Sequence, residues 1–105
     1  MKIKNAGLDF CVPTSEEVKC VYDGVVSKVT ILPHNQYVVI VCHGNYYTVY
    51  NGLDHVKVVV GKPVERGGVV GSFDNESLYA NFIFQVWKGH ECLDPYKWLI
   101  KYNKK

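Results

Sequence analysis

Histidine and cysteine are the side chains of this sequence whose chemistry could support a metal site or a nucleophile. There are four of each among the 105 residues: His34, His43, His55 and His90, and Cys11, Cys20, Cys42 and Cys92. The cysteines form no CxxC pair, so neither a zinc knuckle nor a thioredoxin-like redox motif is indicated. The spacing leaves one alternative zinc pair open, His90 with Cys92. We expect solvent-exposed histidines in turns at His34 and His55, and buried thiols rather than required disulfides.

Other catalytic motifs are missing from the sequence. It contains no GxSxG, and none of its cysteines stands beside a predicted helix start with basic neighbours, as an activated thiol would. The glycine-rich stretch 61–71 lacks the GxxxxGK[ST] spacing of a phosphate loop, so we assign its glycines to turns. A lipoyl or biotinyl carrier domain would need a lysine at a hairpin tip, whereas Lys28 lies in the middle of a predicted strand.

Length and composition predict one domain over residues 1–105, because 48% hydrophobic residues suffice for a single core. The net charge is +2, and the lysines are scattered apart from Lys101, Lys104 and Lys105, so nucleic-acid binding is not indicated. No apolar run reaches the roughly 20 residues of a membrane span. We also expect no secretory signal within this chain, since no apolar segment follows its first basic residues.

Runs of β-branched and aromatic residues between turn residues predict an all-β fold. The predicted strands cover residues 18–22, 25–32, 37–43, 46–50, 56–60 and 81–87, with short glycine-punctuated strands between 61 and 71. Asp23-Gly24 is predicted as a bend or bulge, and Gly44-Asn45 as a two-residue hairpin turn. Residues 74–77 form a predicted polar loop. Asp94-Pro95 predicts one short helical turn that runs to about Leu99.

The strand predicted over residues 81–87 is expected to be central. Period-two alternation places Phe82, Phe84 and Val86 on one face, and Asn81, Ile83, Gln85 and Trp87 on the other. Both faces are largely apolar, which is typical of a strand that is covered on both sides.

Six segments in a fixed order resemble one known family. They are Asn5-Ala6-Gly7-Leu8-Asp9, Asp23-Gly24-Val25-Val26, the hairpin from His43 to Tyr50, Gly61 to Gly71, Asn81-Phe82-Ile83-Phe84-Gln85, and Leu93-Asp94-Pro95 with Trp98-Leu99. Together they resemble the lysostaphin/LytM-type peptidoglycan metallopeptidases over residues 5–99, and especially their degenerate EnvC-like relatives. The resemblance implies a compact, barrel-like, two-sheet sandwich of short antiparallel strands, one sheet of which carries the site in a groove.

The same resemblance indicates that the zinc site has been lost. It places Asn5, Asp9 and Ile83 at the three zinc-ligand positions, and Gly52 and Asn81 at two further histidine positions that handle the water and the developing charge. Only Asp9 keeps a family ligand, and of its two interpretations, a vestigial groove residue or a carboxylate that caps a loop, we favour the second slightly. Catalytic zinc usually needs three protein ligands, and isoleucine supplies none. We therefore predict no bound metal, no cofactor and no catalytic residue.

The predicted role is that of a non-catalytic regulator. By resemblance to EnvC-like activators, the partner is a peptidoglycan amidase or another cell-wall hydrolase in the cell envelope or periplasm. Its contact surface is the vestigial groove, predicted to contain Asn5, Asp9, Gly52, Asn81, Ile83 and Gln85. The flanking aromatics are Tyr46, Tyr47, Tyr50, Phe82 and Trp87, unless most of these fill the core. The alternatives are a zinc metalloendopeptidase with unusual ligands and a passive peptidoglycan-binding module.

Overall fold

The fold is built from β-strands in the part of the chain that the computed structural model describes. This part comprises the backbone of residues 8–74, 78–89 and 91–93, and the side chains of residues 12–74 and 78–89. Its strands are, in chain order, β1 (Leu8–Pro13), β2 (Val18–Lys19), β3 (Gly24–Ile31), β4 (Tyr37–His43), β5 (Tyr46–Leu53), β6 (His55–Val56), β7 (Pro63–Val64), β8 (Val69–Ser72), β9 (Tyr79–Lys88) and β10 (Glu91–Leu93). Within these residues no helix is long and apolar enough to cross a bilayer.

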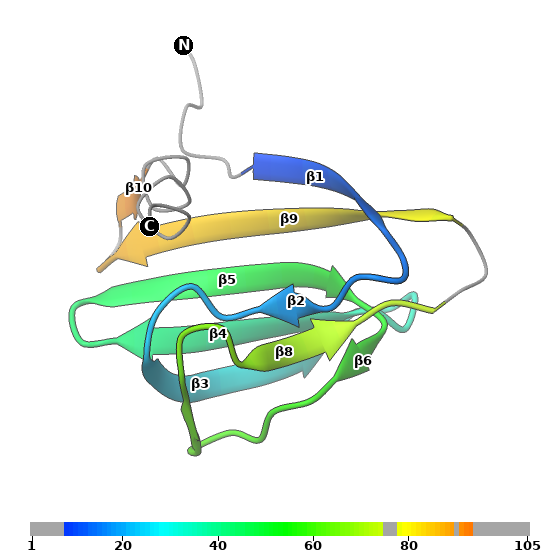
Figure 1. The fold of residues 1–105 in the computed structure, drawn as a ribbon. Helices are drawn as coiled ribbons and strands as arrows, with labels where there is room; N and C mark the ends of the chain where they lie inside the picture. The colour runs from blue at the N-terminus through cyan, green and yellow to red at the C-terminus, as the bar shows by residue number, and fades with distance from the viewer. Residues whose placement is uncertain (1–7, 75–77, 90, 94–105) are drawn as a thin grey trace, which may run out of the picture.

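The strands form two antiparallel sheets. The larger sheet has the order β1-β9-β5-β4-β3-β7, with β10 also pairing with β9, and the smaller sheet has the order β2-β8-β6. Figure 1 shows β2, β8 and β6 lying across the face of the larger sheet near β3 and β4. The predicted all-β, two-sheet class is therefore confirmed.

The core lies between the two sheets. In β9 the buried side chains are Phe82, Phe84 and Val86, while Ile83 is half-buried, so the predicted alternation is confirmed. β9 has β1 and β10 along one side and β5 along the other, as expected for an interior strand. The larger sheet also contributes Val26, Val39, Val41, Tyr50 and Leu53 to this core, and the smaller sheet with its adjoining loops contributes Cys20, Val21, Val70 and Phe73.

The hairpin of β4 and β5 agrees with the sequence closely. β4 spans the predicted residues, and Gly44-Asn45 connects it to β5, with Gly44 at a φ of 80°. This turn pairs His43 with Tyr46 and Val41 with Thr48, which fixes the face on which every later residue of β5 lies. β5 continues beyond the predicted end at residue 50 to Leu53.

Two predicted strands are wrong in extent. Residues 56–60 leave the sheet after Val56, because the Lys62 N–H donates to the Val59 carbonyl and Gly61 adopts a φ of 89°, which together make a turn. The strand expected over residues 18–22 ends at Lys19. Strands β1 and β10 were not predicted. The expected helical turn from Asp94 to Leu99 lies outside the described residues.

Candidate functional site

The face of the larger sheet that points away from the smaller sheet carries Ile83 and Gln85, two of the predicted groove residues. Its side chains form rows across neighbouring strands: Val38, Asn51 and Ile83; Ile40, Val49 and Gln85; and Cys42, Tyr47 and Trp87. We call these nine residues the outer face. None of them is charged, and the indole N–H of Trp87 donates to Gln85 Oε1 at 3.3 Å. The outer face is thus an apolar surface with amide groups.

The sheet register brings several predicted site residues together. The backbone of Asp9 in β1 lies directly across from Ile83 in β9, and Asn51 in β5 lies across from Ile83 on the other side. Asn81 lies two residues before Ile83 and is exposed. Asn5 lies outside the described residues. β1, β9 and β5 therefore place two of the predicted ligand positions, 9 and 83, on adjacent strands.

Gly52 occupies a bulge in β5. The pairing of β4 with β5 passes from Val38 opposite Asn51 to Tyr37 opposite Leu53, which leaves Gly52 as an extra residue. Its φ is 110°, and a Cβ added there would lie 2.9 Å from the Asn81 carbonyl oxygen. The carbonyl of Gly52 accepts a hydrogen bond from Gln36 Nε2 at 3.3 Å. The backbones of β5 and β9 therefore approach each other at Gly52 and Asn81, the two positions at which the resemblance predicts lost histidines.

A zinc ion does not fit the residues at these positions. Ile83 offers only hydrocarbon at a ligand position, and Gly52 has no side chain and no room for one without a backbone shift. Catalytic zinc sites need three protein ligands and an open position for water. Among the described residues, no group of three histidine, cysteine or acidic side chains could hold a metal ion.

The predicted aromatic flank is partly wrong. Tyr50 and Phe82 are only 1% and 7% exposed, and both point into the core. There they line a cleft of about 350 Å³ between the residue 12–21 segment and β9, with Phe84 beside them. Of the five aromatics, Tyr46, Tyr47 and Trp87 are half-buried. Register explains the difference, since Tyr47 and Trp87 face each other on the outer face while Tyr50 pairs with Phe84 on the inner one.

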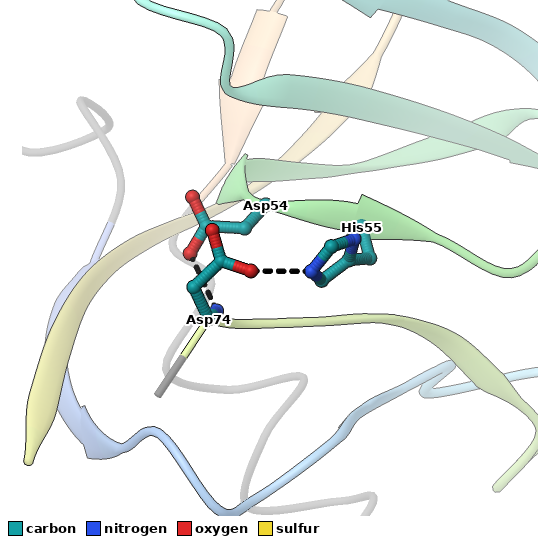
Figure 2. A network of polar contacts seen from close by, with 3 residues as sticks. All are labelled: Asp54, His55 and Asp74. Carbon is teal, nitrogen blue, oxygen red and sulfur yellow. Dashed lines mark hydrogen bonds and ion pairs between the residues drawn. The ribbon is translucent and has the colours of Figure 1, made fainter. Parts of the chain in front are cut away.

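His55 lies in strand β6 and not in the predicted turn, although it is exposed as expected. Its Nε2 is hydrogen-bonded to Asp74 Oδ1, and the Asp74 N–H donates to Asp54 Oδ2 at 2.9 Å (Figure 2). The side chains of His55 and Asp74 are 55% and 50% exposed, and exposed pairs contribute only about 0–1 kcal/mol. This cluster therefore joins β6 to the segment after β8.

The remaining histidines and cysteines follow the predictions in part. His34 is exposed in the turn between β3 and β4, and Cys20 is a buried free thiol. Cys42 is also free but only half-buried. His90 and the side chain of Cys92, the alternative zinc pair, lie outside what the structure describes. The His43 ring nitrogens lie within hydrogen-bond distance of the Asp23 carbonyl and the Thr48 hydroxyl, contacts that sequence reasoning missed.

Solved structures share this fold. LytU superposes with a TM-score of 0.77 at 25% identity, covering 90% of this chain and 72% of LytU. The antimicrobial peptidase lysostaphin from Staphylococcus simulans gives 0.77 at 20% identity, covering all of this chain and 48% of lysostaphin, so this chain spans about half of that protein. A chain of the SpoIIQ–SpoIIIAH pore-forming complex gives 0.66 at 25% identity, covering 93% of this chain and 65% of that one.

The sequence also matches a family model. The model describes Peptidase family M23, and the match covers residues 3–95, nearly the whole chain. No curated protein matches the sequence significantly. The two-sheet fold, the order of the motif segments and this match agree, and the chain belongs to Peptidase family M23.

Proposed function

We propose that this domain is a non-catalytic member of family M23 that binds and regulates a cell-wall hydrolase in the cell envelope. The observation that carries the proposal is the cross-strand pairing of Asp9 with Ile83, beside the bulge at Gly52. Where the family resemblance calls for imidazoles, the chain has an aliphatic side chain and a glycine. Without a metal ion, nothing lowers the pKa of an attacking water, so binding rather than hydrolysis is the activity left.

The outer face supports a protein partner. Its nine residues are uncharged, and Tyr47 and Trp87 stand side by side as a cross-strand aromatic pair. Interface centres are depleted in charge and enriched in aromatic residues, which supply most of the binding energy. Similarity to a chain of the SpoIIQ–SpoIIIAH complex, at 25% identity, supports the use of this fold in protein assemblies. By resemblance to EnvC-like activators, the first partners to test are peptidoglycan amidases.

The test of this proposal is amidase activation. The purified domain is added to the autoinhibited amidases of the same organism, and dye release from labelled murein is measured. We expect activation by the wild-type domain and a loss of about 30-fold in apparent affinity for Ile83→Glu, because a buried unpaired carboxylate at an interface centre costs about 2 kcal/mol or more.

The matched control is Val60→Glu, which makes the same aliphatic-to-carboxylate change on a turn away from the outer face, where Val60 is 52% exposed. It should activate as the wild type does. If Ile83→Glu activates the amidase as well as the wild type does, the partner contacts a surface of the domain other than the outer face. Chelator-sensitive cleavage of murein peptides by the domain alone would show instead that the domain is a metallopeptidase. Binding to murein without any effect on amidases would show that it is a passive peptidoglycan-binding module.

A further inference from the structure

A line of hydrogen bonds runs from the end of β4 into the core. His43 Nδ1 lies 2.8 Å from the Asp23 carbonyl oxygen, and His43 Nε2 lies 2.8 Å from Thr48 Oγ1. Thr48 Oγ1 lies 3.0 Å from the Tyr50 hydroxyl. Thr48 and Tyr50 are 0% and 1% exposed, so no bulk water replaces these contacts. The line crosses from β4 to β5 and continues toward the smaller sheet.

The line ends at the segment that joins the two sheets. The Val21 N–H donates to the Tyr50 hydroxyl at 3.2 Å, and the Cys20 sulfur lies 3.7 Å from the same hydroxyl. The Cys20 thiol donates to the Tyr22 carbonyl at 3.0 Å. The segment 20–23 runs from β2 of the smaller sheet to β3 of the larger one. Hydrogen bonds to Tyr50 near its start and to His43 at its end therefore attach this segment to the larger sheet.

With His43 neutral, every group in the line is satisfied. A carbonyl only accepts, so Nδ1–H must donate to Asp23, and Nε2 is left as an acceptor. Both hydroxyl hydrogens can rotate, so either oxygen of the Thr48–Tyr50 contact can be the donor. When Thr48 donates to Nε2, the Tyr50 hydroxyl donates to Thr48 Oγ1, and the Tyr50 oxygen accepts from Val21 N–H. Burial raises the pKa of Tyr50, which keeps its hydroxyl protonated and able to donate.

With His43 protonated, the direction reverses. Both ring nitrogens become donors, so Thr48 must accept from Nε2 and donate to Tyr50. The Tyr50 hydroxyl then donates to the Cys20 sulfur, which is a weak acceptor 3.7 Å away. Burial of the imidazole lowers the pKa of His43, an effect that the Asp23 carbonyl and the Asp23 charge oppose. The neutral form therefore fits this site better.

We propose that this line is an acid-sensitive clasp, in which protonation of His43 reverses the hydrogen bonds through Thr48 and Tyr50 and loosens segment 20–23 from the larger sheet. The titratable and charged groups around His43 in the described residues come from three places. They are Tyr22, whose ring meets the imidazole edge-on at 6.4 Å, Asp23, whose carboxylate accepts the Arg66 N–H, and Tyr46 across the hairpin, whose ring has Lys88 Nζ at 5.6 Å.

The sign of the pH effect follows from linkage. The folded pKa of His43 lies below its ordinary value of 6.5, so the unfolded chain takes up the proton first as the pH falls. The stabilisation is therefore complete above about pH 6.5. It decreases in the window between pH 6.5 and the folded pKa of His43, and it is lost once the pH has fallen through that folded pKa. Each pH unit within that window lowers the protection of segment 20–23 by up to about tenfold.

The experiment is NMR on the full chain. Nitrogen shifts of His43 should show the Nδ1–H tautomer and a titration midpoint below 6.5. Exchange protection of the Val21 amide, corrected for intrinsic rates, should fall through the same pH range. The Nε2–H tautomer, a midpoint above 6.5, or Val21 protection that does not change with pH would each overturn the clasp.

Two variants separate the clasp from general acid sensitivity. Thr48→Val breaks the line in its middle while keeping the side-chain volume, and His43→Gln removes the titrating group. In either variant, Val21 protection should no longer depend on pH through the His43 window. If a variant does not fold, the wild-type measurements decide the question on their own.

Discussion

The double variant Asn5→His, Ile83→His should bind one zinc ion per chain, whereas the wild-type domain should purify without stoichiometric metal. The resemblance to LytM-type peptidases places these two residues at ligand positions with Asp9. The backbones of residues 9 and 83 are already paired, and cross-strand partners have Cβ atoms only about 4.5–5.5 Å apart. Two histidines and an aspartate supply the three protein ligands that an open zinc site requires.

We expect an apparent zinc affinity of roughly 10 kcal/mol at neutral pH, the lower end for structural sites, which corresponds to a dissociation constant near 50 nM. Metal content by elemental analysis and competition with a fluorescent chelator measure it. Binding should weaken below about pH 6.5, because the ligands must be neutral imidazoles.

Asp9→Asn in the same double variant is the control, and it should abolish stoichiometric binding. A double variant that takes up no zinc would show that Asn5 and Ile83 have been assigned to the wrong positions. Stoichiometric zinc in the wild-type domain would contradict the proposed non-catalytic role itself.

The strands that sequence predicted well are those whose neighbours along the chain determine their pairing. β4 and β5 are joined by Gly44-Asn45, so composition and turn chemistry act on the same few residues. The exception is β9, which pairs with the distant strands β1 and β5 and was predicted from the alternation of residues 81–87, whose inner-facing side chains lie in the core. The segment 56–60 has the composition of a strand too, but a hydrogen bond from Lys62 to Val59 turns it away from the sheet.

The faces of β5 were harder to predict because both contain apolar residues. Tyr47 and Tyr50 are three residues apart, so period-two alternation places them on opposite faces. The run around them is nearly continuously apolar, so the alternation did not show which of the two faces is the outer one. The hairpin register resolves this, since it pairs Val41 with Thr48 and Val39 with Tyr50. Counting residues from the turn would also have placed His43 beside Thr48.

The bulge at Gly52 could not have been found by such counting. It depends on the approach of β9, whose residue Asn81 lies far along the chain, and on a φ that only the assembled sheet reveals. The sequence indicated the loss of a histidine at this position. The fold adds that the backbone has taken the space that the side chain would need.

Gly52→His, which introduces the residue that the resemblance predicts at this position, should destabilise the domain by about 2–6 kcal/mol. A non-glycine residue at a φ of 110° costs about 1–3 kcal/mol, and overpacking against the Asn81 carbonyl oxygen, 2.9 Å from the new Cβ, costs a similar amount. The opposing atom belongs to the backbone of an interior strand, so it cannot move aside as a flexible side chain would. Urea unfolding monitored by tryptophan fluorescence measures the change.

Two alanine variants separate conformation from crowding. Gly61 has a φ of 89° with nothing within 4 Å of an added Cβ, so Gly61→Ala reports the conformational cost alone. Gly52→Ala should cost about 1–3 kcal/mol more, the contribution of the contact with Asn81. Equal costs would mean that β5 can relax away from β9. In that case the sheet backbone would accept a histidine at position 52. The lack of catalysis would then be due only to missing side chains, which a few substitutions could restore.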